Sequence, residues 1–374
     1  MNTLHIISFD IPYPANYGGV IDVFYKIKAL HSKGIKIILH CFQYDHKEIA
    51  AALNQYCEEV HYYPRAKSML SWFSATPFIV QTRNDKGLLE RLCKDDYPIL
   101  FEGVHCCYFL SDKKLQSRQK LLRTHNVEHQ YYKHLAKTEK SLFKKIFFYT
   151  EAWKLKRFEN NLQNANYILS ISESDRSFFA QKNKSVVLLN AFHANNEVSI
   201  QKGLGHYCLF HGNLSIEDNS AAASWLIKNV FAENTIQFII AGKNPDEDLI
   251  SYCKAFKNVQ LVSNPSDKEL NDFIQNAQIN ILYSSQEAGV KLKLINVLFR
   301  GRHCVANLKT VAGSGLEMLV HKAEKAIDFR IQLSRLMNVE YRASENPSRK
   351  DILMMHFDNS QNIDILISLF KDDV

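Results

Sequence analysis

The chain contains no run of about 18 uninterrupted apolar residues, so its sequence predicts no membrane-spanning helix. It also lacks the G-x-G-x-x-G pattern of dinucleotide-binding loops. Its 8 cysteines show no paired spacing of the kind that holds zinc, and only Cys106 and Cys107 are adjacent. Neighbouring cysteines rarely form a bridge. We therefore expect reduced cysteines that lie mostly in the core.

The first residues contain no basic segment, apolar segment or small-residue cleavage site, and they lead directly into the strand-like segment 4–9. This is not the pattern of a secretory signal, so we expect a cytoplasmic protein. Low-complexity tracts and short-period repeats are also absent from the sequence. That composition predicts a folded, globular chain.

Short β-branched or apolar runs alternate with amphipathic stretches in both halves of the 374-residue chain. This alternation predicts parallel sheets flanked by helices, and the length favours two domains. The expected strands are 4–9, 35–41, 60–63, 99–102, 121–124, 167–171 and 186–189 in the first half, and 207–211, 236–241, 259–262, 279–283 and 304–306 in the second. The predicted fold class is α/β, with two doubly wound, Rossmann-like domains that face each other across a cleft.

We place the N-terminal domain at 1–195 and the C-terminal domain at 206–355. The polar, aperiodic segment 190–205 is the expected linker. Residues 356–374 include a short amphipathic helix over 362–370, which is a candidate to pack back across the domain junction.

The net charge of +7 belongs to the first half of the chain. Residues 1–200 hold 27 Lys and Arg against 19 Asp and Glu, whereas residues 201–374 hold 19 against 20. Within 131–160, lysines alternate with Phe and Trp at helical spacing, which favours an interfacial helix on an anionic membrane surface. An apolar core face would explain the same pattern. No nucleic-acid-binding module is recognised, so no nucleic-acid partner is expected.

A paired-glycine turn, Gly18-Gly19, lies directly after the first expected strand and before a helix over 20–32. Glycines allow the backbone to approach a ligand closely, and the amides at a helix start attract phosphate. A plain turn is the alternative interpretation.

His125 follows another expected strand at its carboxyl end, within the segment 123–129. A histidine at this position can hydrogen-bond a sugar hydroxyl or a developing charge near neutral pH. A histidine that only bonds loop carbonyls is equally consistent with the sequence.

The segment 284–298 specifies its chemistry best, because a strand, a glycine turn and a helix follow one another. Gly289 and Val290 offer amides at the helix start, and two lysines close by could neutralise a diphosphate. Lys293 and Asn296 are three residues apart, so one ligand could meet both. The residues concerned are Gly289, Val290, Lys291, Lys293 and Asn296. We favour a binding function over a solvated basic helix, because apolar residues fill most other positions.

Gly212 and Asn213 follow the first expected strand of the second domain and could line the same phosphate site. A capping turn explains them equally well, with Asp218 or Asn219 as the N-cap of the following helix.

Taken in order, these motifs resemble the GT-B glycosyltransferases of the retaining, family-4 type, and the similarity covers nearly the whole chain. The resemblance implies donor binding by the second domain and acceptor binding by the first. It implies that Gly19 lies near the donor phosphate, His125 near the transferred sugar and Lys291 or Lys293 on the diphosphate. It also implies that Asn296 lies near the nucleotide ribose.

The sequence departs from that family in one important place. The family shows two glutamates eight residues apart, whereas here Asn296 and Ala288 occupy those positions. Glu287 is the nearest carboxylate and is the candidate to contact sugar hydroxyls.

From these residues we expect a glycosyltransferase of the hexosyltransferase class, with His125 and Glu287 as catalytic candidates. It would move a sugar from a nucleotide-sugar donor to a saccharide or lipid-linked acceptor, with retention and without a metal or other cofactor. A nucleotide-sugar epimerase of the same architecture and a non-catalytic sugar-nucleotide-binding protein are the alternatives.

Overall fold

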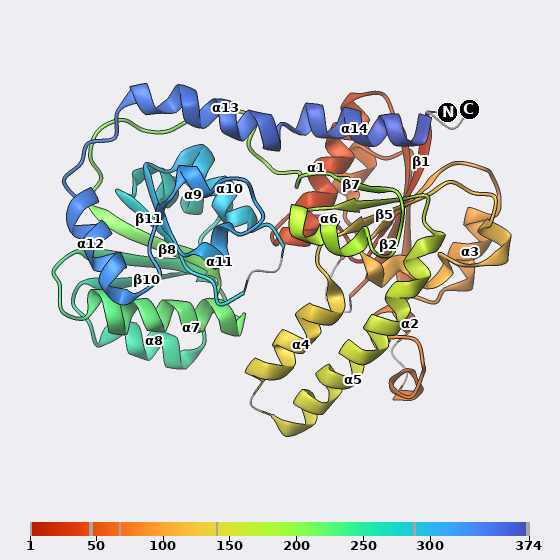
Figure 1. Cartoon of the computed structure of the whole chain (residues 1–374), viewed down its shortest axis with the longest axis horizontal. Helices are drawn as coiled ribbons and strands as arrows, with labels where there is room; N and C mark the ends of the chain where they lie inside the picture. The colour runs from red at the N-terminus through yellow and green to blue at the C-terminus, as the bar shows by residue number, and fades with distance from the viewer. Residues whose placement is uncertain (1, 45–47, 67–68, 140, 287–288, 372–374) are drawn as a thin grey trace. The chain divides into compact units, whose positions relative to one another are not determined.

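The computed structural model describes residues 2–44, 48–66, 69–139, 141–286 and 289–371. The chain divides into two compact units, which are both seen in Figure 1. Unit 1 is Met1–His193 together with Asn359–Val374, and unit 2 is Ala194–Asp358. Most of the polar segment predicted as the linker therefore belongs to unit 2, and the final helix belongs to unit 1.

Unit 1 contains a seven-stranded parallel sheet in the order β3-β2-β1-β4-β5-β6-β7. Its strands are β1 (Thr3–Ser8), β2 (Lys36–Gln43), β3 (Glu59–Pro64), β4 (Ile99–Glu102), β5 (Lys120–Thr124), β6 (Tyr167–Ser170) and β7 (Val186–Leu188). Its helices are α1 (Gly18–Ser32), α2 (Phe78–Gln81), α3 (Lys86–Leu92), α4 (Glu128–Thr138), α5 (Leu142–Phe158), α6 (Glu173–Phe179) and α14 (Asn359–Lys371). The first strand thus lies inside the sheet, and the chain winds outward from it in both directions, which is the doubly wound arrangement.

Helix α1 shows how the sequence builds this unit. Its apolar residues recur at helical spacing and are fully or almost fully buried: Val20, Val23, Phe24, Ile27 and Leu30. Burying each such side chain contributes roughly 1.5–3 kcal/mol to folding. The same face also carries two buried charged residues, Asp22 and Lys26, which the apolar pattern did not predict.

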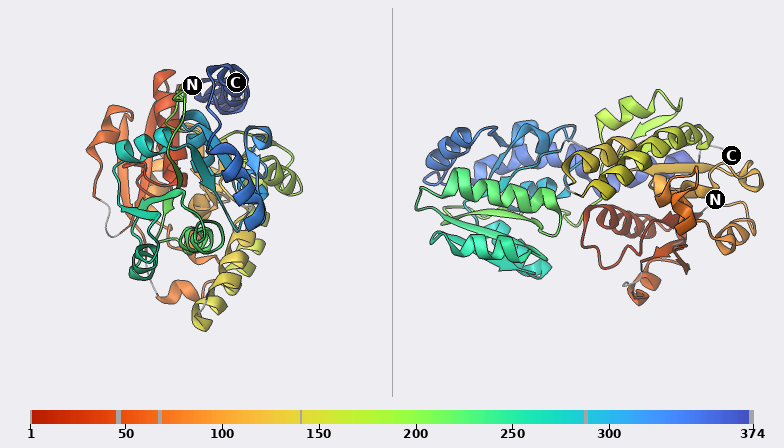
Figure 2. Two further views of the ribbon diagram at one scale, coloured as in Figure 1. Left: turned by 90° about the vertical axis from the view of Figure 1, so that its left-hand side faces the viewer. Right: turned by 90° about the horizontal axis from the view of Figure 1, so that it is seen from below.

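Unit 2 contains a six-stranded parallel sheet in the order β10-β9-β8-β11-β12-β13. Its strands are β8 (Tyr207–Asn213), β9 (Gln237–Lys243), β10 (Val259–Ser263), β11 (Ile279–Leu282), β12 (His303–Ala306) and β13 (His321–Lys322). Its helices are α7 (Glu217–Leu226), α8 (Glu247–Lys254), α9 (Asp267–Asn276), α10 (Leu292–Arg300), α11 (Leu308–Val311), α12 (Ala326–Leu336) and α13 (Asn346–Phe357). Helices cover both faces of the sheet in each unit (Figures 1 and 2).

The predicted fold class, α/β with two doubly wound, Rossmann-like domains, is confirmed. Each of the twelve expected strands overlaps a strand of the structure, with ends that differ by at most two residues. β13 was not predicted, because a two-residue strand carries no periodic signal.

Three histidines line up across the first three strands of unit 1. The ring of His40 stacks on His5 at a centroid distance of 5.1 Å and on His61 at 5.4 Å. His5 Nδ1 and His40 Nε2 are 2.9 Å apart, and His40 Nδ1 is 2.9 Å from the Tyr63 hydroxyl. Burial holds the pKa of His40 well below its usual range, and the two neighbouring histidines act in the same direction. The centre of this row is therefore a neutral imidazole at neutral pH.

Among the residues described, no helix is both long enough and apolar enough to cross a membrane.

Candidate functional site

The strand order of each sheet identifies where a ligand would bind. In doubly wound sheets, ligands lie outside the carboxyl ends of the strands, at the point where the order reverses. In unit 1 this point lies between β1 and β4, and in unit 2 it lies between β8 and β11. The strand ends at these two switch points are therefore the candidate ligand sites.

A buried ion network lies at the switch point of unit 1. Asp22 and Lys26 come from the buried face of α1, Glu102 ends β4, and Arg123 lies in β5, and all four are at most 1% exposed. Lys26 Nζ lies 3.0 Å from Asp22 Oδ2 and 2.7 Å from Glu102 Oε1. Two carboxylates and two cations thus neutralise one another below the strand ends, which is the condition under which buried charges are tolerated.

Asp22 is the centre of this network. Arg123 donates to both of its oxygens, from Nε and Nη2 at 3.1 Å each, and the backbone amide of Phe192 donates to Oδ1 at 2.8 Å. Burial alone would raise the pKa of Asp22, but Arg123 and Lys26 outweigh burial and hold it well below its usual range. Asp22 is therefore ionised and can only accept hydrogen bonds.

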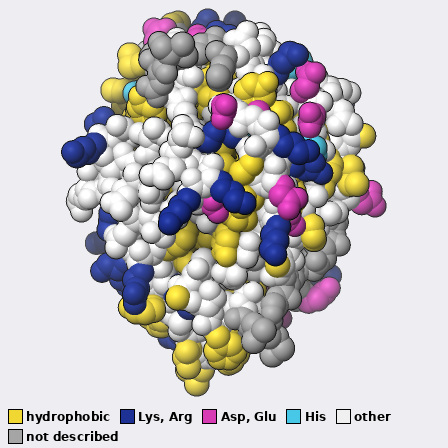
Figure 3. All heavy atoms as spheres, turned by 90° about the vertical axis from the view of Figure 1, so that its right-hand side faces the viewer, with side chains coloured by type: hydrophobic (Ala, Val, Ile, Leu, Met, Phe, Trp, Pro, Cys, Tyr) yellow, Lys and Arg dark blue, Asp and Glu magenta, His cyan; other side chains and the backbone are white. Residues whose placement is uncertain are grey.

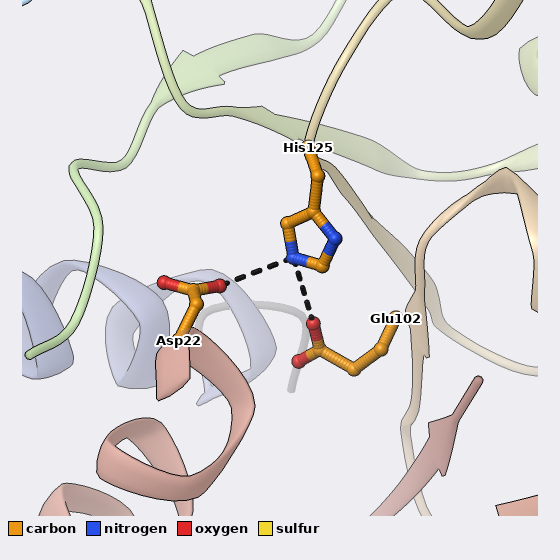
Figure 4. Close-up of side chains that lie close together, drawn as sticks. All are labelled: Asp22, Glu102 and His125. Carbon is orange, nitrogen blue, oxygen red and sulfur yellow. Dashed lines mark hydrogen bonds and ion pairs between the residues drawn. The ribbon is translucent and has the colours of Figure 1, made fainter. Parts of the chain in front are cut away.

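His125 lies at the end of β5 and points into this network (Figure 4). Its Nε2 is 3.2 Å from Asp22 Oδ2 and 3.7 Å from Glu102 Oε2. Since the Asp22 carboxylate is acceptor-only, Nε2 must carry the proton that they share. The other ring nitrogen, Nδ1, points away from both carboxylates (Figure 4). The network thus fixes the orientation and tautomer of His125. In this tautomer Nδ1 carries no proton and can accept a hydrogen bond.

The ring of His125 is also held on its apolar side. It meets Phe9 edge to face at a centroid distance of 5.5 Å. A Cβ on Gly19 would lie 2.6 Å from Phe9 Cζ, closer than real contacts allow. Gly19 therefore permits helix α1 to begin against Phe9. This packing role is independent of the phosphate contact predicted for Gly18 and Gly19, which remains a prediction.

Asp22, Glu102 and His125 could also be considered as metal ligands, because one ligand atom from each lies within 4.8 Å of the others. The charges do not favour this. Lys26 and Arg123 already supply two positive charges to the two carboxylates. A divalent ion would have to approach those cations, so the arrangement fits an ion-pair network better than a metal centre.

In unit 2 the corresponding place is occupied by a half-buried lysine. Lys293, from the first turn of α10, has its Nζ 3.1 Å from Asn219 Oδ1 and 5.3 Å from the centroid of the Phe210 ring. Burial lowers the pKa of Lys293 to about 8, although Asp218 acts to raise it. Within the described ranges, Lys293 forms no ion pair with a carboxylate. An ammonium that is half-buried and held by an amide and a ring, with no carboxylate within ion-pair distance among the described residues, is suited to bind an anionic ligand.

His211 lies beside this lysine at the end of β8. It is 4% exposed, and its Nε2 has no hydrogen-bond partner among the residues described. Burial lowers the pKa of His211 to about 3, and Lys293 acts in the same direction. A neutral imidazole with an unused polar atom therefore adjoins the ammonium. His211 was not among the predicted site residues, although it is the last residue of the expected strand 207–211.

The predicted residues Gly212 and Asn213 support Lys293 indirectly. A Cβ on Gly212 would meet the Asn219 side chain at 3.1 Å, so the glycine lets that side chain lie against the strand. Asn219 Nδ2 donates to the Asn213 carbonyl at 2.9 Å, and its Oδ1 then accepts from Lys293.

The predicted N-cap role for Asp218 or Asn219 is wrong. Helix α7 begins at Glu217 after Ile216, which puts both residues inside its first turn. From there Asp218 accepts from the Ser285 amide at 3.1 Å, tying α7 to the segment that follows β11.

The turn before α10 places the other predicted residues. Gly289 has φ of +64°, a conformation that favours glycine, and Lys291 is the N-cap of α10. Val290 lies between them. The helix therefore starts within two residues of the predicted position. Glu287, the second catalytic candidate, lies outside the described residues.

Asn296 and Lys293 share α10 but contact different neighbours. The Asn296 Nδ2 donates to Asn271 Oδ1 at 3.3 Å, and its Oδ1 accepts from Asn195 at 3.3 Å. The structure thus ties Asn296 to α9 and the start of unit 2, and ties Lys293 to α7. Contact of one ligand with both side chains remains a prediction.

A separate cavity of about 490 Å³ lies in unit 1, away from these residues. It is lined by the segment that precedes α2, by the segment that follows β4 and by the end of α5, including Tyr108, Asp112, Trp153 and Arg157. None of the predicted site residues lines it. The strand ends are the better candidate for the functional site, because none of the buried charged residues described above lines the cavity.

Comparison with known proteins identifies the fold. No protein-family model matches the chain. A curated relative, an uncharacterized 44.6 kDa protein in the cps region of Klebsiella pneumoniae, is 29% identical over 319 residues, which are 80% of this chain and 81% of that protein.

Similar solved structures include HepE from Anabaena in complex with UDP and glucose (TM-score 0.69, 9% identity, 100% of both chains) and TarM from S. aureus (0.68, 11%, 99% of both). The lipopolysaccharide outer core galactosyltransferase WaaB is also similar (0.64, 14%, 100% of both). The chain has the GT-B fold of these proteins.

Proposed function

We propose that this chain is a GT-B glycosyltransferase that moves a sugar from a nucleotide-sugar donor to a saccharide or lipid-linked acceptor. The observation that carries the proposal is the half-buried ammonium of Lys293 at the switch point of unit 2, which has no carboxylate partner among the described residues. A diphosphate would supply the missing negative charge. The amides at the start of α10 would add further donors.

In this proposal the chain's own groups act on the two ends of the donor. Lys293 and the turn at Gly289–Lys291 hold the diphosphate and stabilise the charge that develops as it leaves. His125, oriented by Asp22, contacts the transferred sugar through Nδ1. Glu287 is the proposed carboxylate for the sugar hydroxyls. We expect no metal, because lysine and helix amides supply the positive charge, and retention at the anomeric carbon follows from the family resemblance alone.

The comparisons support this assignment without naming the substrates. HepE was solved with UDP and glucose, and WaaB is a galactosyltransferase, so proteins of this fold include ones that bind or transfer sugars. The relative in the cps (capsule) region favours polysaccharide biosynthesis as the setting. We further propose a cytoplasmic location, where nucleotide sugars are made.

Two alternatives predict different products. Incubating the purified protein with a panel of nucleotide sugars should release nucleoside diphosphate and free sugar if the chain is a transferase, because water replaces the missing acceptor slowly. Inversion at C2 with the nucleotide still attached would indicate an epimerase. Tight binding with neither reaction would indicate a sugar-nucleotide-binding protein.

A further inference from the structure

Helix α5 exposes an unusual number of large apolar side chains. Leu142 is 77% exposed, Phe143 67%, Ile146 67%, Tyr149 44% and Trp153 57%. Four of these, at 142, 146, 149 and 153, recur every three or four residues and therefore lie along one face of the helix. We call the five residues together the apolar face of α5. A monomeric soluble protein rarely leaves such a contiguous surface uncovered.

This face is not the side by which the helix packs on unit 1. Ala152 and Leu155 are at most 1% exposed and provide the buried side, and Phe148 meets Tyr132 of α4 at 5.9 Å. The alternative raised by the sequence, that the apolar residues of 131–160 only form a core face, therefore accounts for one side of α5 and leaves the other unexplained.

A second segment extends the same surface. The ring of Trp72 lies 5.8 Å from Phe143 and 5.1 Å from Phe147, and the adjacent Phe73 is 87% exposed. Lys154 Nζ donates to the Trp72 carbonyl at 2.8 Å and fixes this segment to α5. The α4–α5 hairpin extends away from the sheet of unit 1 in Figure 1, and hydrophobic side chains gather at the lower edge of the space-filling view (Figure 3).

The charges around the apolar face are positive. The exposed basic residues of the hairpin are Lys133, Lys137, Lys144, Lys156 and Arg157. Of its acidic residues, Glu151 is 1% exposed and lies 2.8 Å from Lys154, Glu128 is 3% exposed, and Glu139 at the end of α4 is half-buried. Arg157 lies over the Trp153 ring at 4.8 Å, which places a cation beside an aromatic side chain. Aromatic and aliphatic side chains surrounded by lysines are typical of helices that lie in the interface of an anionic bilayer.

We propose that the apolar face of α5, together with Trp72 and Phe73, docks the protein on an anionic lipid bilayer. The apolar side chains enter the boundary between head groups and acyl chains, and the flanking lysines meet lipid phosphates. A second copy of the chain is a poorer occupant, because a two-fold interface would bring this basic surround against itself. The inference goes beyond sugar transfer, and its test measures binding and not catalysis.

The test is co-sedimentation of the full chain with vesicles of phosphatidylcholine alone or with about 30% phosphatidylglycerol, an anionic lipid. Wild-type protein should bind the anionic vesicles, with an affinity that falls as salt rises. The variant Leu142→Ser/Phe143→Ser/Ile146→Ser should lose binding by about 100-fold or more, because each apolar side chain contributes about tenfold or more when it leaves water. The variant Lys133→Gln/Lys137→Gln should bind the anionic vesicles with an affinity that is about fivefold lower for each lysine replaced.

The matched control is Ile327→Ser/Ile331→Ser in α12 of unit 2, where both side chains are also more than half exposed, at 55% and 57%. It should bind vesicles as wild type does. Circular dichroism and release of nucleoside diphosphate from a nucleotide sugar should be the same in all variants, which separates loss of docking from loss of fold or chemistry. Equal vesicle binding by wild type and the triple-serine variant would overturn the proposal, as would no binding by wild type. So would a wild-type dimer in analytical ultracentrifugation that the triple-serine variant abolishes.

Discussion

Replacing Lys293 by methionine should make the protein more stable and a poorer binder of nucleoside diphosphates. Methionine keeps the length of the side chain and removes the ammonium. Burial lowers the pKa of Lys293 from 10.5 to about 8, which corresponds to about 3 kcal/mol of unfavourable free energy in the folded state at neutral pH. Loss of the 3.1 Å bond from this ammonium to Asn219 offsets about 1.5–3 kcal/mol of this gain. The free energy of unfolding should therefore rise by up to about 1.5 kcal/mol.

Binding should change in the opposite direction. A charge-assisted bond from an ammonium to phosphate contributes roughly 1.5–3 kcal/mol, so the Kd for UDP should rise about 10- to 150-fold. Isothermal titration with UDP measures the Kd, and urea denaturation measures stability. Lys257→Met, at an exposed lysine of unit 2, is the control and should change neither quantity appreciably. An unchanged Kd together with lower stability would refute the idea that Lys293 is kept for an anion.

The pH dependence gives an independent check of the same residue. The pKa of Lys293 is lower in the folded state than in the unfolded state, so between about pH 8 and 10.5 the unfolded chain binds more protons at this site. The penalty is thus fully present below pH 8 and disappears as the pH rises to 10.5. The stability advantage of Lys293→Met over wild type should shrink across that window. An advantage that stays constant from pH 7 to 10.5 would contradict the assignment.

Three other perturbations test the rest of the structure. Asp22→Asn leaves two buried cations without their shared carboxylate, so it should lower the free energy of unfolding by about 3–5 kcal/mol, as measured by urea denaturation. It should also slow sugar release by disturbing His125, and full activity in the folded variant would exclude that positioning role. The pKa of His40 lies below its unfolded value of 6.5, so stability should fall as the pH drops below 6.5, and His40→Phe should flatten this slope in pH-dependent denaturation. Gly19→Ala should cost about 1–3 kcal/mol because its Cβ meets the ring of Phe9, and adding Phe9→Leu should restore most of the loss in thermal unfolding; no restoration would point to another cause.

Periodicity was sufficient to predict most of the fold. Alternating strand and helix patterns specify local structure and its parallel arrangement, so the sequence indicated the strands of both sheets before their pairing was known. The start of α10 near residue 290 was predictable because a glycine with positive φ separates a strand from an amphipathic helix. The residues at which each unit begins and ends depend on long-range packing, so local sequence patterns do not predict them. The assignment of the final helix to unit 1 is an example.

The candidate site was only partly predictable, for a physical reason. Asp22 and Lys26 lie four residues apart on an apolar helix face, and their partners come from two distant strands. Charges at such positions look like surface residues until the sheet brings Glu102 and Arg123 beside them. A buried-charge signal was nevertheless present, because β4 and β5 both carry a charged residue near the end of an otherwise apolar run. His211 gave no such signal.

A crystal structure of the protein with a bound nucleoside diphosphate would test the central claim most directly. The claim requires a phosphate oxygen about 3 Å from Lys293 Nζ, at the amino end of α10. A diphosphate bound at another place, with Lys293 still held by Asn219 alone, would contradict it.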